Sequence, residues 1–72
     1  MSNNVRKTFG ERLKELRIEK GLSVKELSTA IGVSDVAIVY WENDKRTANI
    51  VALNTLADFF GVSADYLIGR ED

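Results

Sequence analysis

The chain of 72 residues contains no cysteine, no histidine and no proline. Without cysteine or histidine it forms no disulfide bond, none of the common zinc sites and no catalytic centre built on imidazole or thiolate. No apolar run approaches the length of a membrane span, and no secretory signal is expected before the fold. We therefore expect no metal, no cofactor and no membrane contact, and the missing cysteines fit a cytoplasmic protein.

An excess of charge of one sign is also missing, since ten Lys and Arg stand against eleven Asp and Glu. This balance gives no support to nucleic-acid binding, but it does not exclude it, because the position of the basic residues decides. Carboxylates and serines are present, but without histidine, cysteine or a Gly-rich phosphate loop no nucleophile–base pair can be named, so we do not expect an enzyme. A hydrophobic content of 44% predicts one small domain with a thin core.

Apolar residues recur at helical spacing, and β-branched residues are scattered instead of alternating, so the sequence predicts an all-α fold of five helices. Each helix begins after a capping residue, and these are Thr8, Ser23, Ser34, Asn49 and Ser63. Four of the helices end at a glycine, namely Gly21, Gly32, Gly61 and Gly69. One domain is thus expected over residues 8–69, between a flexible segment 1–7 and a tail 70–72.

Within each predicted helix the apolar side chains fall on one face, which we expect to be buried. These positions are Phe9, Leu13, Leu16, Leu27, Ile31, Ile38, Trp41, Ile50, Leu53, Leu56, Ala57, Phe60, Tyr66 and Leu67. Gly32 supplies a tight turn between the second and third helices, and Val33 fills the space beneath it. In the loop that follows the third helix, Asn43 and Asp44 tolerate the left-handed backbone conformation.

Three segments carry more than helical spacing: FGERLKELRIEKGLS (9–23), WENDKR (41–46) and FFGVSADYLIG (59–69). With the buried positions they make the chain resemble the lambda-repressor-like family, the Cro/C1-type or XRE regulators of bacteria and phages. The resemblance implies a compact five-helix domain with a helix-turn-helix at the second and third helices. It also implies a transcriptional repressor that binds double-stranded DNA in the cytoplasm.

The resemblance assigns roles to particular side chains. The third helix enters the major groove, where base edges meet Asp35, Val36, Ala37 and Tyr40. Backbone phosphates are held by Ser23, Lys25, Ser34, Asn43, Lys45 and Arg46. The family also pairs the positions of Arg17 and Glu42, which ties the first helix to the end of the third.

Family members usually bind as two-fold dimers on palindromic sites, so the resemblance implies a homodimer. In the sequence, four apolar residues flank the core positions of the last two helices: Phe59, Val62, Ala64 and Ile68. These side chains either reach a second copy of the chain or cap a small core.

The chain departs from the family pattern on the side that would face DNA. Val24, Asp44 and Ala48 stand where the family usually has Gln, Gly and Pro, and these changes lower the expected affinity. Asp44 in particular places an anion near the DNA backbone.

The third helix itself is unusually apolar for a DNA reader. None of its base-reading candidates is Arg, Lys, Asn or Gln, the residues that make bidentate contacts with bases. The same surface supports a second hypothesis, in which Val36, Val39 and Tyr40 form an apolar stripe that binds a protein. The domain would then act as an antirepressor or adaptor.

Overall fold

The computed structural model describes residues 7–70 and folds them into helices joined by short loops. These are α1 (Phe9–Glu19), α2 (Val24–Ile31), α3 (Asp35–Glu42), α4 (Ile50–Phe60) and α5 (Ala64–Leu67). The prediction of an all-α domain is confirmed, and no helix in this range is long and apolar enough to cross a membrane. Residues 1–6 and 71–72, which hold most of the predicted flexible segment and tail, lie outside the described residues.

The helix ends follow from local side-chain chemistry. Every predicted N-cap accepts a hydrogen bond from the backbone amide three residues later, at donor–acceptor distances of 2.8–3.1 Å. Thr8 and Ser23 form full capping boxes, because Glu11 and Glu26 accept from the cap amides in return. Gly32 ends α2 with a φ of +76°, a conformation that a residue with a Cβ adopts at a cost.

Each helix contributes one fully buried aliphatic side chain to a single core. These five residues are Leu13, Leu27, Ile38, Leu56 and Leu67. Phe9, Trp41 and Ala57 complete the buried set. Burying one aliphatic side chain of this size stabilises the fold by about 1.5–3 kcal/mol, so every helix is held to the same centre.

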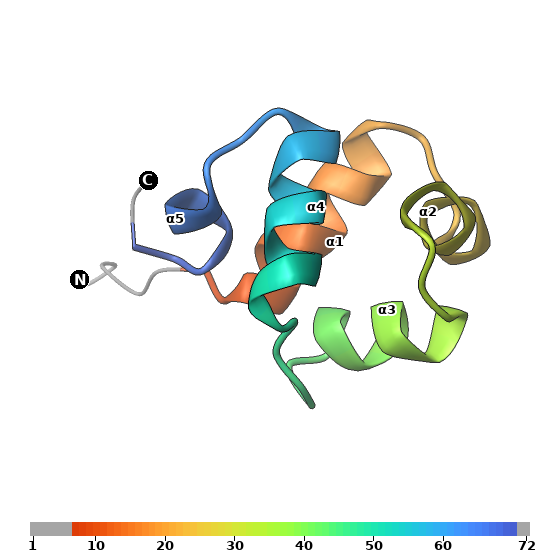
Figure 1. The fold of residues 1–72 in the computed structure, drawn as a ribbon, viewed down its shortest axis with the longest axis horizontal. Helices are drawn as coiled ribbons and strands as arrows, with labels where there is room; N and C mark the ends of the chain where they lie inside the picture. The colour runs from red at the N-terminus through yellow and green to blue at the C-terminus, as the bar shows by residue number, and fades with distance from the viewer. Residues whose placement is uncertain (1–6, 71–72) are drawn as a thin grey trace.

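The helices surround this core in a simple arrangement (Figure 1). α1 and α4 occupy the middle of the molecule, with α2 and α3 on one side and α5 on the other. α1 packs against α3 and α5, α2 against α3 and α4, and α4 against α5. α3 lies at the lower right of this view, below α1 and α2, and packs against both of them.

Two details differ from the sequence prediction. Ile50, expected on the buried face of α4, is 73% exposed, and its neighbour Val51 is 71% exposed. Ile50 is the first residue of α4, and within residues 7–70 no other helix covers its side chain. Helical spacing identifies the apolar face of a helix, but it does not show how far along that face the neighbouring helices extend. In the loop after α3, Asp44 is left-handed at a φ of +57°, whereas Asn43 has a φ of −102°.

The N-terminus of α1 meets the C-terminal end of α3 at Gly10. A Cβ atom on Gly10 would lie 2.5 Å from the carbonyl oxygen of Trp41 and 2.7 Å from that of Glu42. Asp44 seals this junction: its carboxylate accepts from the Thr8 hydroxyl at 2.6 Å and from the Gly10 amide at 3.0 Å. The negative charge thus lies at the positive end of the α1 dipole, where it is stabilising.

We predict that Gly10→Ala destabilises the domain despite the better helix propensity of alanine. The new methyl group meets backbone atoms that cannot rotate away, and overpacking of this kind costs about 1–3 kcal/mol. For a domain of this size the melting temperature should fall by about 10 °C in a circular dichroism melt.

A control variant separates this effect from helix propensity. Asn54→Ala changes an exposed position within α4 and should leave the melting temperature unchanged or slightly higher. If Gly10→Ala melts no lower than the wild type, the backbones of α1 and α3 do not approach this closely.

Candidate nucleic-acid interface

The turn between α2 and α3 brings the two helices into close contact. The amides of Gly32 and Val33 both donate to the carbonyl oxygen of Ser28, at 2.9 Å and 3.0 Å. Ser28 is only 3% exposed, so its small side chain allows α3 to pack closely on α2. Val33 is half-buried against the core, as expected for a residue that fills the space under the turn.

The outward face of α3 is largely apolar. Val36 is 58% exposed, Val39 43% and Tyr40 41%. Ala37, one of the base-reading candidates, is instead half-buried against the core. Of the base-reading candidates, the structure therefore exposes Val36 and Tyr40 as broad surfaces and leaves Ala37 mostly covered.

Asp35 is exposed at the start of α3, but one of its carboxylate oxygens accepts a hydrogen bond from the Ser28 hydroxyl. Its chemistry is therefore partly used within the protein. An acceptor for a cytosine amine would have to come from the remaining oxygen.

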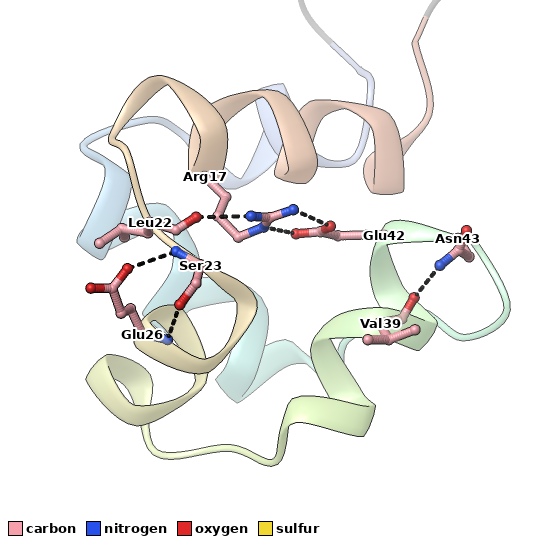
Figure 2. Close-up of polar contacts among 7 residues, drawn as sticks. All are labelled: Arg17, Leu22, Ser23, Glu26, Val39, Glu42 and Asn43. Carbon is pink, nitrogen blue, oxygen red and sulfur yellow. Dashed lines mark hydrogen bonds and ion pairs between the residues drawn. The ribbon is translucent and has the colours of Figure 1, made fainter.

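The phosphate candidates fall at the ends of α2 and α3. Lys25 and Lys45 are exposed and form no ion pair with any residue between 7 and 70. The Arg46 guanidinium lies over the Tyr40 ring, 5.6 Å from its centroid. The side-chain amide of Asn43 donates from Nδ2 to the carbonyl oxygen of Val39 at 2.8 Å (Figure 2).

The serine candidates act as helix caps. Ser23 accepts from the amide of Glu26 at 3.0 Å (Figure 2), and Ser34 from the amide of Ala37 at 3.1 Å. These bonds use the hydroxyl oxygen as an acceptor, so the hydroxyl hydrogen stays outside the cap. A phosphate at either helix start could therefore accept hydrogen bonds from the serine hydroxyl and from the free backbone amides of the first turn.

Arg17 and Glu42 form a bidentate ion pair (Figure 2). Nε of Arg17 lies 2.6 Å from one carboxylate oxygen of Glu42, and Nη2 lies 3.0 Å from the other. The side chains are 12% and 6% exposed, and hydrogen bonding to Glu42 raises the pKa of Arg17 above its ordinary value. The remaining nitrogen, Nη1, donates to the carbonyl oxygen of Leu22 at 2.8 Å.

The acidic side chains of residues 23–46 are all engaged within the protein. Glu26 accepts from the Ser23 amide, Asp35 from Ser28, Glu42 from Arg17, and Asp44 from Thr8 and Gly10. The basic side chains of the same segment, Lys25, Lys45 and Arg46, remain at the surface. Glu26, Asp35 and Asp44 are exposed as well, and among the described residues only Glu42 of these four acids is paired with a cation, so anion binding here depends on where Lys25, Lys45 and Arg46 lie.

The dimer candidates are not equally exposed. Phe59 packs edge-to-face on Phe60 with ring centroids 5.0 Å apart, and the Lys20 ammonium lies 5.5 Å from the Phe59 ring. Val62 packs against the core and Ala64 is half-buried. Ile68, at 44% exposed, is the most exposed of the four.

Three functional or supporting contacts were not predicted from the sequence. They are the Ser28–Asp35 hydrogen bond, the Asp44 cap on α1, and the buried Arg12, whose guanidinium lies 4.4 Å from the Tyr66 ring centroid. A Ser at position 28 and an Asp opening α3 are the local signals for the first. The other two depend on which helices meet in space, which spacing alone does not reveal.

Comparison with known proteins adds independent findings. A family model described as a helix-turn-helix domain matches residues 10–72. The chain is 36% identical over 64 residues to the HTH-type transcriptional activator BcrR of Enterococcus faecalis, covering 89% of the chain and 31% of BcrR. It is 31% identical over 65 residues to the HTH-type transcriptional regulator ImmR of Bacillus subtilis, covering 90% of the chain and 51% of ImmR. The chain thus spans about a third to a half of the length of these relatives.

The fold is similar to that of a repressor whose structure was solved in complex with DNA. The P22 c2 repressor bound to a synthetic operator superposes with a TM-score of 0.85 at 31% identity. The match covers 90% of this chain and 98% of the repressor chain.

We predict that Glu42→Ala lowers stability strongly, because it leaves the Arg17 guanidinium largely buried without its carboxylate. Removing one partner of a buried pair costs about 3–5 kcal/mol. Thermal melts followed by circular dichroism should show a fall in melting temperature of well over 10 °C.

Glu19→Ala, which removes an exposed carboxylate from the last turn of α1, serves as the matched control and should melt close to the wild type. Equal melting temperatures for Glu42→Ala and Glu19→Ala would show that the ion pair does not support the fold.

Proposed function

Because the chain belongs to the helix-turn-helix domain family, we propose that it is a sequence-specific regulator of transcription that binds double-stranded DNA. In this proposal α3 lies in the major groove, and the protein acts without catalysis, metal or cofactor in the cytoplasm of a bacterium or phage host. The DNA complex of the similarly folded P22 c2 repressor supports the assignment.

One observation carries the proposal: Arg17 joins the start of α2 to the end of α3. Its guanidinium bonds the carbonyl oxygen of Leu22, directly before Ser23, and the carboxylate of Glu42, directly before Asn43. Figure 2 shows these bonds as one line of contacts between the two helix ends. Two groups of phosphate candidates from separate parts of the sequence are thereby held at a fixed spacing, as binding along a DNA backbone requires.

Base recognition would rest on apolar contacts. Val36 can touch the methyl group of thymine, and Tyr40 offers a ring and one hydroxyl. Neither makes the bidentate contacts that discriminate bases by about 1–3 kcal/mol each. We therefore propose a preference for A·T-rich sites, with groove shape contributing to specificity.

Backbone contacts would provide most of the affinity. Lys25, Lys45 and Arg46 supply the charge, and the caps Ser23 and Ser34 supply hydroxyl groups and helix N-termini. With so few cations, one copy binds modestly, and two copies on a palindrome would bind more tightly. We propose a homodimer whose contact includes Ile68, the most exposed of the four dimer candidates.

Repression is the proposed mode of regulation, by occupation of promoter DNA. BcrR is named an activator and the P22 protein a repressor, so both outcomes occur among similar proteins. The position of the bound site relative to the promoter would decide which outcome applies.

A second candidate function follows from the exposure of Val36, Val39 and Tyr40. Three adjacent side chains that are each at least 41% exposed form an apolar stripe suited to a protein partner. In that case the domain would use its helix-turn-helix as an adaptor surface and not as a DNA reader.

Selection from a random duplex library at moderate salt decides between the two candidates. The DNA-binding proposal predicts enrichment of an A·T-rich palindrome whose half-sites lie about one helical turn apart. Failure to enrich any sequence, with a purified protein partner captured through the Val36–Tyr40 face, would favour the adaptor.

The phosphate assignment predicts a defined loss for Lys45→Ala combined with Arg46→Ala. Affinity should fall by a similar factor for the selected duplex and for unrelated duplexes. The negative slope of log affinity against log salt should become shallower by about 2. Fluorescence anisotropy titrations at several salt concentrations measure both quantities.

The matched control is Lys14→Ala combined with Arg70→Ala, which removes the same charge from exposed positions outside residues 23–46. A control that loses as much slope as the test variant would mean that Lys45 and Arg46 do not contact phosphates directly.

A further inference from the structure

A side-chain hydrogen bond links the two helices of the helix-turn-helix. The hydroxyl of Ser28 on α2 donates to Oδ1 of Asp35 on α3. Ser28 is 3% exposed, whereas Asp35 lies at the surface as the first residue of α3. A buried hydroxyl therefore holds an exposed carboxylate.

The chemistry of the contact favours the carboxylate as acceptor. The single hydroxyl hydrogen of Ser28 has two acceptors within reach, Asp35 and the carbonyl oxygen of Lys25 at 2.9 Å. A hydrogen bond to a charged oxygen is the stronger of the two kinds. The bond draws one oxygen of Asp35 toward α2, beneath the surface that α3 presents.

We propose that Ser28 is a positioning residue for DNA binding, which holds the Asp35 carboxylate against α2 and keeps its charge away from phosphates. The proposal rests on the proposed function, because the charge matters only where DNA lies beside α3. Without the hydroxyl, the carboxylate is free to turn within the first turn of α3, next to Ser34 and Val36. Those residues are a phosphate candidate and a base-reading candidate.

Asp35 differs in this respect from the other acidic residues of the segment. Glu26 completes a capping box, Glu42 holds Arg17, and Asp44 caps α1, so their release would damage the fold. The partner of Asp35 can be removed by Ser28→Ala, which takes away one oxygen atom and leaves a small residue in a buried position. The role of the hydroxyl can therefore be tested in a folded protein.

The experiment measures binding of Ser28→Ala, Asp35→Asn and the double variant to the selected duplex, carrying a fluorescein label, at low salt. Ser28→Ala should bind about three- to tenfold more weakly, since one freed charge then repels the backbone. Asp35→Asn sets the reference affinity for a protein without this charge. The double variant should bind within about twofold of Asp35→Asn, because no charge remains to be released.

Thr55→Ala is the control for removal of a helix hydroxyl. Within residues 7–70 the Thr55 hydroxyl bonds the carbonyl oxygen of Val51 in its own helix, at 3.0 Å, and no residue of another helix, so DNA affinity should not change. The positioning role is wrong if Ser28→Ala binds as well as the wild type. It is also wrong if the double variant binds as weakly as Ser28→Ala, so that Asp35→Asn does not restore the lost affinity. A large loss in Asp35→Asn alone would show instead that Asp35 reads a base.

A measurement without DNA tests the contact itself. In urea unfolding, the shifts caused by Ser28→Ala and Asp35→Ala should not add in the double variant, because both changes break the same bond. Additive shifts would overturn the contact. A wild-type chain that binds no duplex would overturn the proposed function and the role of Ser28 in it, whereas equal binding by wild type and Ser28→Ala overturns only the latter.

Discussion

The arrangement of the helix-turn-helix depends on the hydrogen bonds and the ion pair that the Arg17 guanidinium forms with Leu22 and Glu42. α2 and α3 have 8 residues each, and helices this short do not keep an orientation by themselves. Arg17 reaches from α1 to the start of one and the end of the other, and its planar set of donors allows little freedom of angle. Because the ion pair is nearly buried, water and salt compete weakly for it.

A second attachment lies near the other end of α1. Gly10 allows the α1 backbone to touch that of α3, and Asp44 closes the contact from the loop. Gly10 and Arg17 are about two helical turns apart on α1, and both meet the C-terminal end of α3, at Trp41 and Glu42. The C-terminal end of α3 is therefore fixed by α1, and the rest of the helix is held by its packing against α2 and by the buried Ile38.

Much of the fold could be predicted because its signals are local. The caps Thr8 and Ser23 and the left-handed Gly32 depend on residues within one turn, and periodicity identified Leu13 and Leu56 as buried. The Arg17–Glu42 pairing came from family resemblance, since no local pattern joins residues so far apart.

The remaining features depend on tertiary contact. Ile50 has the spacing of a core residue, yet within residues 7–70 it remains 73% exposed at the start of α4. Asp44 was expected as an anion at the DNA-facing rim, but its carboxylate is bound to the start of α1, because Gly10 brings the two segments together. The Ser28–Asp35 bond likewise requires the angle between α2 and α3. From α3 the core takes Ile38 and Trp41, with Ala37 partly covered beside them, so substitutions at the exposed Val36, Val39 and Tyr40 would change the outer surface of α3 at little cost to the packing beneath it.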